Sequence, residues 1–273
     1  FTFGRSRFPL GVQLFETSRH AHTHNNRRGS SSTTTTTVLN DWCPSCNDTK
    51  LCSHKFLFIV ATGRSGSTTL MNMVNLVPHV YVYGENGMMF EPKVLRSNFL
   101  RMMLSTRTLQ RPTPGHDGAW NHPPAEIADR RFRIGFQHYM WTWLEPLAIP
   151  GRMVSVRGFK EIRWTAKNLK TIRHICPCSR FISSFRLDVE AQHASNFQGK
   201  KSVEQLRNMT AQQHTMLQNL GAATFELPVE RFTFAEFNKL AAWLGANCTF
   251  ASIVHSNDGG MKERPTSDRA GCE

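Results

Sequence analysis

The sequence predicts an α/β fold of three layers, in which helices flank a central, mainly parallel β-sheet. From residue 56 onward, apolar runs of strand length alternate with longer amphipathic stretches. Such alternation is typical of parallel strands that are joined by helical crossovers. The first apolar run, residues 56–61, leads into a loop of small and hydroxylated residues and then directly into an amphipathic stretch. That order indicates a strand, an anion-binding loop and a helix.

The other elements follow from the same two periodicities. Further strands are predicted at residues 80–83, 153–159, 180–185 and 223–227. The pattern Thr233-Phe-Ala-Glu236 is a capping box, which opens a last helix that ends at Leu244. Residues 105–124 carry four prolines and predict a long loop. The remaining helices are expected at residues 70–77, in a stretch up to 103, at 126–147, at 165–175, from 188, and at 202–220.

The composition favours a single domain with an anionic partner. The chain has 273 residues and a formal net charge of +13. An anionic cofactor together with an acidic acceptor fits this charge. Nucleic acid is disfavoured as the partner, because only the net charge suggests it. The chain shows no zinc-finger, homeodomain or RNA-binding signature. No apolar run approaches the roughly 18 residues of a membrane helix.

Residues 1–40 predict a flexible, basic and Ser/Thr-rich stem, and residues 41–273 predict the folded domain. The stem closes on three serines and five threonines, a tract that cannot bury a core. A basic arm for nucleic acid is the alternative, which the Ser/Thr tract disfavours. Because the chain begins with Phe1 rather than Met, we expect an N-terminal membrane anchor to be missing from it.

Cysteines and glycosylation sequons favour an oxidising, secretory-pathway lumen. Seven cysteines are many for a cytosolic enzyme of this size. Three Asn-x-Ser/Thr sequons accompany them and predict a glycoprotein. The sequons begin at Asn47, Asn208 and Asn247.

The cysteine spacing leaves the state of the thiols open. Disulfides are the first interpretation, and the odd number leaves one thiol over. A zinc site formed by Cys43, Cys46, Cys52 and His54 is a second, although this spacing is not a common one. Reduced, inert cysteines are a third. The sequence does not decide which cysteines pair.

The loop after the first strand has the residues of an anion-binding site. Gly63 and Gly66 let the backbone approach a phosphate closely, and the following helix start offers free N–H groups. Arg64 adds a fixed charge with a fork of donors. The nucleotide-kinase loop is excluded, because it needs four residues between its glycines and then a lysine. The hydroxyl donors are Thr62, Ser65, Ser67, Thr68 and Thr69.

The segment Gly63-Arg64-Ser65-Gly66-Ser67-Thr68 resembles the 5′-phosphosulfate loop of carbohydrate-type sulfotransferases. These enzymes transfer a sulfuryl group from 3′-phosphoadenosine 5′-phosphosulfate (PAPS). The resemblance implies a P-loop-like fold and PAPS as cofactor, with no metal. It also implies that residues 62–69 bind the 5′-phosphosulfate. A plain Ser/Thr/Gly turn between strand and helix is the alternative.

A second segment resembles the same family. Arg186 ends a predicted strand where sulfotransferases place an arginine that binds the 3′-phosphate of the cofactor. Ser195, nine residues later, is the counterpart of their serine, and Gln192 lies near it. Guanidinium binds phosphate through paired hydrogen bonds. The alternative for Arg186 is a surface ion pair with Asp188 or Glu190.

Two weaker matches extend the resemblance over residues 56–245. Residues 156–163 resemble the Gly-Phe-Lys-Glu strand of the carbohydrate type, and residues 225–232 with 242–245 resemble a late strand and helix of the family. Residues 259–264 loosely match a basic loop that closes over the 3′-phosphate.

The chemistry implies two catalytic residues. Arg64 stabilises the charge that builds on the leaving phosphate. Glu85 follows the second strand, where related enzymes place the base that takes the acceptor's proton. The alternatives for Glu85 are a turn carboxylate or an ion pair with Lys93 or Arg96. His79 and His138 are weaker candidates for the base, and Lys160 is a candidate to line the site.

The sequence therefore predicts a PAPS-dependent sulfotransferase that acts on a carbohydrate hydroxyl or amine. We expect it in the Golgi lumen as a type II membrane protein. A sulfotransferase for a small alcohol, phenol or lipid is the alternative within the class. A P-loop kinase and a non-catalytic basic protein that binds anionic glycan or nucleic acid are the alternatives outside it. Acceptor identity and oligomeric state carry no readable signal.

Overall fold

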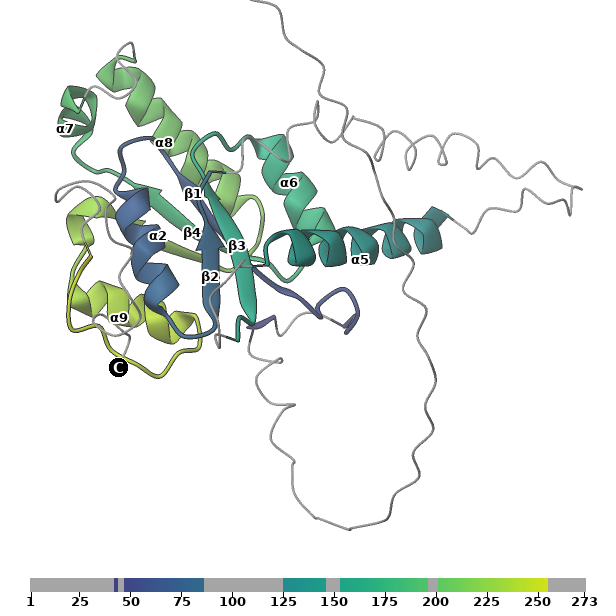
Figure 1. Cartoon of the computed structure of the whole chain (residues 1–273). Helices are drawn as coiled ribbons and strands as arrows, with labels where there is room; N and C mark the ends of the chain where they lie inside the picture. Colours follow the sequence, from purple (N-terminus) through teal and green to yellow (C-terminus); the bar gives the residue numbers. More distant parts are fainter. Residues whose placement is uncertain (1–41, 44–46, 86–124, 146–152, 196–200, 255–273) are drawn as a thin grey trace, which may run out of the picture. The chain divides into compact units, whose positions relative to one another are not determined.

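A computed structural model describes residues 42–43, 47–85, 125–145, 153–195 and 201–254 (Figure 1). All of them belong to the unit that spans Thr37–Glu273. The predicted stem lies outside the described residues. So do the helix predicted up to residue 103, the loop at 105–124 and the basic segment at 259–264.

The described strands form one parallel sheet of five strands in the order β2-β3-β1-β4-β5. Strand β1 lies in the centre, with Lys55 opposite Val156 and Ala61 opposite Ser184. The predicted α/β fold with a parallel sheet is confirmed. The strand bounds are β1 Lys55–Ala61, β2 Val80–Tyr83, β3 Val156–Glu161, β4 Arg180–Phe185 and β5 Thr224–Pro228.

Helices cover both faces of the sheet and complete the three layers. Helices α2 and α9 lie on one face, and α5, α6 and α8 lie on the other (Figure 1). In the part of the chain that the structure describes, no helix is both long and apolar enough to cross a bilayer. The bounds are α2 Ser67–Leu76, α5 Ala125–Trp143, α6 Ala166–Ile175, α7 Val189–Ala194, α8 Val203–Gln218 and α9 Phe234–Trp243, with a 3₁₀ turn, η1, at Val229–Arg231.

The alternation of side chains along β1 explains why the sheet has two cores. Leu57 and Ile59 pack with α2 and α9, whereas Phe56, Phe58 and Val60 pack with α5 and α6. Successive side chains of a strand point to opposite faces, so a central parallel strand that is covered twice must be apolar throughout. Every β1 residue after Lys55 is buried, which accounts for the continuous apolar run in the sequence.

Hydroxyl and carboxylate caps fix the starts of four helices. The side chains of Thr165 and Asp188 accept from the backbone N–H groups of Asn168 and Ala191 at the starts of α6 and α7. Ser202 forms a complete capping box at α8. Thr233 accepts from the N–H of Glu236, which confirms the predicted start of α9.

Two boundaries differ from the prediction in a way that matters for the site. Helix α2 begins at Ser67, three residues before the predicted start at 70, because Gly66 serves as its N-cap. Strand β3 begins at Val156 rather than 153 and runs on through Lys160 and Glu161, which pair with β1. Lys160 and Glu161 therefore occupy the carboxyl end of β3, where the sequence pattern indicates exit from the strand.

Candidate active site

The loop between β1 and α2 reverses the chain through two residues with left-handed backbone. Arg64 has φ 62° and Gly66 has φ 71°. Gly66 is the N-cap of α2, and its carbonyl accepts the N–H of Leu70. The first-turn N–H groups of α2 therefore face the loop and are the donors that a helix start offers to an anion. Ser67, Thr68 and Thr69 lie in this first turn of the helix and not in the loop itself.

Glycine is also required at position 66 for steric reasons. A Cβ atom at this position would lie 2.5 Å from Cγ2 of Val229 and 2.9 Å from Cε2 of Phe232. Both residues belong to the turn that follows β5. The segment after β5 thus packs directly against the loop, and only a residue without a side chain lets the two approach so closely.

Strand β4 supports the loop from its other side. The N–H of Thr62 donates to the Ser184 carbonyl (3.3 Å). The Ser184 hydroxyl donates to the Ser65 carbonyl (3.0 Å), and the hydroxyls of these two serines lie 3.4 Å apart. Both serines are fully buried. Ser65 therefore holds the loop on the sheet, and its hydroxyl is not turned to solvent.

Two buried glutamines hold the loop and the strands beneath it. Gln192 of α7 donates from Nε2 to the Gly63 carbonyl (2.6 Å) and to the Thr62 hydroxyl (3.2 Å). Gln213 of α8 donates to the Val60 carbonyl (3.0 Å) and the Ser183 hydroxyl (2.9 Å). Oε1 of Gln192 is buried and, among the described residues, accepts no hydrogen bond. An acceptor in that position beside Gly63 suits a ligand donor or a water molecule.

Arg64 joins the two segments that the sequence singles out separately. Its Nε donates to the Ser195 hydroxyl (3.3 Å) and its terminal nitrogen to the Ser195 carbonyl (3.4 Å). The Ser195 hydroxyl also donates to the Gln192 carbonyl (2.7 Å). The loop after β1 and the end of α7 thus meet over the carboxyl edge of adjacent strands β1 and β4, and Arg64 remains exposed there.

The side chain of Arg186 lies near the carboxylate of Glu230, which was not predicted from the sequence as its partner. Its Nε lies 3.6 Å from Oε1 of Glu230. Glu230 also accepts from the N–H groups of Leu187 (3.0 Å) and Asp188 (3.1 Å). The alternative pairs are not formed, since Asp188 caps α7 and Glu190 pairs with Arg207. Glu230 therefore engages the guanidinium and amide groups that the resemblance assigns to the 3′-phosphate.

Replacing Glu230 with glutamine is expected to tighten binding of a phosphate-bearing nucleotide. An anion that approaches Arg186 meets the negative charge of Glu230, and the amide removes that charge while it keeps one oxygen acceptor. Removing one charge at contact distance near a protein surface predicts a gain of about tenfold in affinity. The measurement is the Kd for 3′-phosphoadenosine 5′-phosphate in the variant and the wild type.

The matched control is Glu190→Gln, which removes a carboxylate from the exposed ion pair between Glu190 of α7 and Arg207 of α8. This variant should leave the Kd unchanged. Weaker binding in Glu230→Gln would contradict the expectation and would mean that Glu230 orients Arg186 for the ligand.

Glu85 is held by Lys160 across the sheet. Lys160 Nζ lies 3.0 Å from Glu85 Oε1, and the lysine side chain is only 8% exposed. Tyr83 pairs with Phe159 and Ile59 pairs with Lys160, so β2, β3 and β1 bring both residues to the edge that carries the loop. The predicted alternatives Lys93 and Arg96 lie outside the described residues. Glu161, next in β3, is buried and accepts from backbone N–H groups and from Arg163.

The two weaker histidine candidates do not lie at this edge. The His79 carbonyl accepts from Val156 at the amino end of β3, and its ring contacts the Met153 carbonyl. His138 lies 6.0 Å from His54, which precedes β1. Burial, followed by the charges of His138 and Arg157, lowers the pKa of His54. Because the amino ends of these strands face away from the loop, His79 and His138 are wrong as candidates for the base.

Ser184 and Gln213 are supporting residues that the sequence analysis missed. Ser184 lies inside an apolar strand and Gln213 inside a helix with many glutamines, so neither carries a local signal. A polar residue within a strand that is buried on both faces is the feature that points to Ser183 and Ser184.

The chain is similar in structure to several proteins of known structure. No family model matches the chain, and no curated protein matches it. The YorR protein of Bacillus subtilis, solved with phosphorylated GDP, matches with 7% identity and a TM-score of 0.34, over 70% of this chain and 95% of its own.

Two further matches are kinases. A sugar kinase from Janibacter sp. is 13% identical, with a TM-score of 0.34 over 71% of this chain and 96% of its own. Dephospho-CoA kinase from Campylobacter jejuni is 13% identical, with a TM-score of 0.27 over 70% and 95% of the two chains. Similarity at this level does not extend to family or function.

Proposed function

We propose that this chain is a sulfotransferase, which moves the sulfuryl group of PAPS to a hydroxyl or amine of a carbohydrate. The observation that carries the proposal is the contact of Arg64 with Ser195. It unites the two segments that resemble the 5′-phosphosulfate loop and the 3′-phosphate site of sulfotransferases. One ligand with two phosphate groups can then contact both segments at once.

The cofactor would bind with its 5′-phosphosulfate on residues 62–69. The left-handed turn at Arg64 and Gly66 and the start of α2 supply N–H donors, and the Arg64 guanidinium supplies charge. The 3′-phosphate would bind Arg186 and the Ser195 hydroxyl, with Glu230 displaced. The fixed positions of Gly63 and Thr62, which hydrogen-bond to Gln192, keep this cradle preorganised.

The transfer would use Glu85 as the base. As the acceptor oxygen attacks sulfur, the bond between sulfur and the 5′-phosphate oxygen breaks, and the acceptor proton passes to Glu85. The negative charge that builds on the leaving phosphate is met by Arg64 and the start of α2. Lys160 holds the Glu85 carboxylate in place through the ion pair of 3.0 Å. The products are a sulfated acceptor and 3′-phosphoadenosine 5′-phosphate.

The secretory-pathway location belongs to the same proposal. The sequon asparagines Asn47, Asn208 and Asn247 are all exposed, which glycosylation requires. Cys248 is disulfide-bonded, which favours the same compartment. The Golgi lumen is the location that this combination supports best.

The test is isothermal titration of the protein with 3′-phosphoadenosine 5′-phosphate and, separately, with ATP. We expect a Kd of about 1–10 µM for the first, near −8 kcal/mol, and no measurable binding of ATP. The chain lacks a lysine in the loop, which a kinase needs for the ATP phosphates. Arg186→Ala should weaken binding by at least about tenfold, because it removes a charge-assisted contact with phosphate.

Arg207→Ala is the matched control, since Arg207 is exposed and pairs only across the surface with Glu190 among the contacts described for it. That variant should bind like the wild type. Equal binding of both nucleotides, or no binding by a folded sample, would overturn the proposal. Uniform weakening in both variants would favour the basic binding protein that recognises charge alone.

A further inference from the structure

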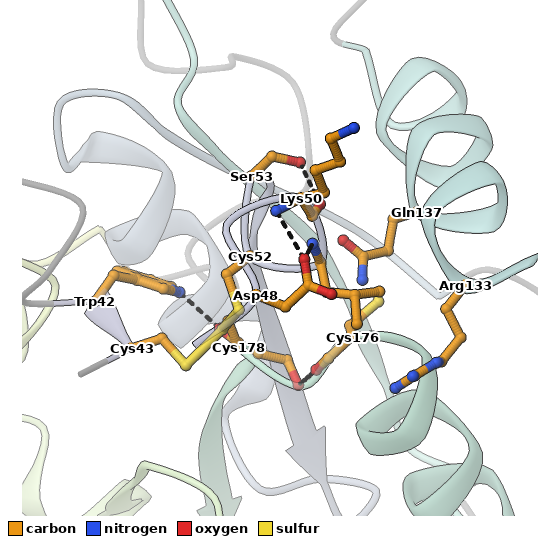
Figure 2. Close-up of a disulfide and its surroundings, with 12 residues drawn as sticks. Trp42, Cys43, Asp48, Lys50, Cys52, Ser53, Arg133, Gln137, Cys176 and Cys178 are labelled. Carbon is orange, nitrogen blue, oxygen red and sulfur yellow. Dashed lines mark hydrogen bonds between the residues drawn. A yellow bond between two sulfur atoms is a disulfide. The ribbon is translucent and has the colours of Figure 1, made fainter. Parts of the chain in front are cut away.

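A cluster of three cysteines lies at the amino end of β4, away from the loop. The Sγ atoms of Cys43, Cys52 and Cys178 all lie within 4.8 Å of one another. Figure 2 shows Cys43 and Cys52 converging on Cys178 from two parts of the N-terminal segment. Of the zinc ligands considered from the sequence, His54 stacks on Trp141 instead, and Cys46 lies outside the described residues.

In the structure, the sulfur of Cys178 is bonded to the sulfurs of both Cys43 and Cys52. The Cα separations are 5.3 Å and 5.6 Å, so the backbone allows either bond. A sulfur atom forms one S–S bond, and the two pairings therefore exclude each other. A disulfide within the cluster engages two of these three sulfurs, whereas a metal ion can use all three at once.

The segment that carries Cys43 is fixed without any help from sulfur. Trp42 is buried, and its Nε1 donates to the Cys178 carbonyl (2.8 Å). Arg180 donates to the Trp42 carbonyl (3.2 Å) and stacks over the Trp42 ring at 4.2 Å. Trp42 thus holds Cys43 beside Cys178 through hydrogen bonds and stacking.

The turn that carries Cys52 is fixed in the same way (Figure 2). The Asp48 carboxylate accepts hydrogen bonds from the N–H groups of Lys50 and Leu51. The backbone carbonyl of Asp48 accepts a hydrogen bond from the N–H of Cys52 (3.0 Å). Arg130 of α5 binds the same carboxylate at 2.7 Å and lowers the pKa of Asp48 to about 2. The three sulfurs are therefore brought together by contacts that would persist if no disulfide formed.

We propose that Cys43, Cys52 and Cys178 bind a divalent metal ion, which the soft thiolate donors select as zinc. Zinc takes four ligands in a tetrahedron, so three sulfurs leave one position for water or another donor. The ion would tie the N-terminal segment to the starts of β1 and β4. It lies away from Arg64 and Glu85, and its role would be structural rather than catalytic.

The experiment is metal analysis of the full chain, secreted from eukaryotic cells and purified without added thiol or chelator. We expect about one zinc ion per chain by mass spectrometry of the metal, and less than about a tenth of that in Cys178→Ser. Cys176→Ala is the matched control. Cys176 is buried in the same Cys-Pro-Cys motif, outside the cluster, and burial raises the pKa of its thiol, so zinc should stay bound.

A second measurement decides the outcome if the Cys178 variant does not fold. A chelator should remove zinc from the wild type and lower its Tm by at least about 5 °C, since structural zinc contributes directly to folding. A peptide map of the unreduced protein that links Cys178 to Cys43 or Cys52, without zinc, would overturn the proposal. Zinc that the chelator removes with no change in Tm would overturn it as well.

Discussion

Replacing Arg64 with alanine is expected to lower kcat by about 10²–10³-fold. Arg64 is exposed at the loop, and its guanidinium is the cation that would face the leaving 5′-phosphate. Removing one preorganised donor from a developing negative charge costs a few kcal/mol in comparable sites. The change adds no backbone strain, since arginine and alanine both carry a Cβ and meet the same cost at φ 62°.

The measurement is the rate at which 3′-phosphoadenosine 5′-phosphate forms from PAPS, with the acceptor on which the wild type is most active. Arg131→Ala is the control, because it removes the same charge from an exposed position on α5. It should keep the wild-type rate. Arg64→Lys should fall between the two, as it keeps the charge but loses the fork of donors.

The same variants distinguish an enzyme from a basic protein that only binds anionic glycan. If the chain is a basic protein that only binds anionic glycan, Arg64→Ala removes one of 33 basic residues and affinity changes little. Equal, small losses in Arg64→Ala and Arg131→Ala would therefore contradict catalysis at the loop and support a charge-driven binder.

The fold was predictable because its signals are local. Each residue of β1 after Lys55 is buried, and such a strand reads as an unbroken apolar run in any parallel sheet with two covered faces. The start of α9 was predictable for the same reason, since Thr233 and the N–H of Glu236 are three residues apart. The start of α2 was missed because residues 67–69 are poor helix formers, and the left-handed Gly66 decides the boundary.

The contacts between site residues could not be predicted, because they depend on strand order. Lys160 and Glu85 are 75 residues apart and meet only because β3 lies between β1 and β2. Glu230 reaches Arg186 because β5 lies beside β4. From the sequence, Asp188 and Glu190 were the candidate partners of Arg186. In the folded chain its partner is Glu230. The same holds for Cys178, which lies 126 residues from Cys52.

Replacing Gly66 with alanine is expected to destabilise the protein and to abolish nucleotide binding. A Cβ atom would lie 2.5 Å from Val229 and 2.9 Å from Phe232, and φ is 71°. The left-handed backbone costs about 1–2 kcal/mol for a residue with a Cβ, and overpacking adds about 1–3 kcal/mol. Together these costs predict a fall in Tm of about 5–15 °C.

The double variant Gly66→Ala with Val229→Ala separates the two causes. It removes the closest atoms, so stability should recover in part, while the cost of the backbone remains. Gly135→Ala is the control, because nothing lies within 4 Å of a Cβ at this position in α5 and its φ is not left-handed. That change should raise stability by about 0.5–1 kcal/mol. Unchanged Tm and nucleotide affinity in Gly66→Ala would mean that the turn after β5 moves freely, and that the close packing of Val229 and Phe232 does not shape the loop.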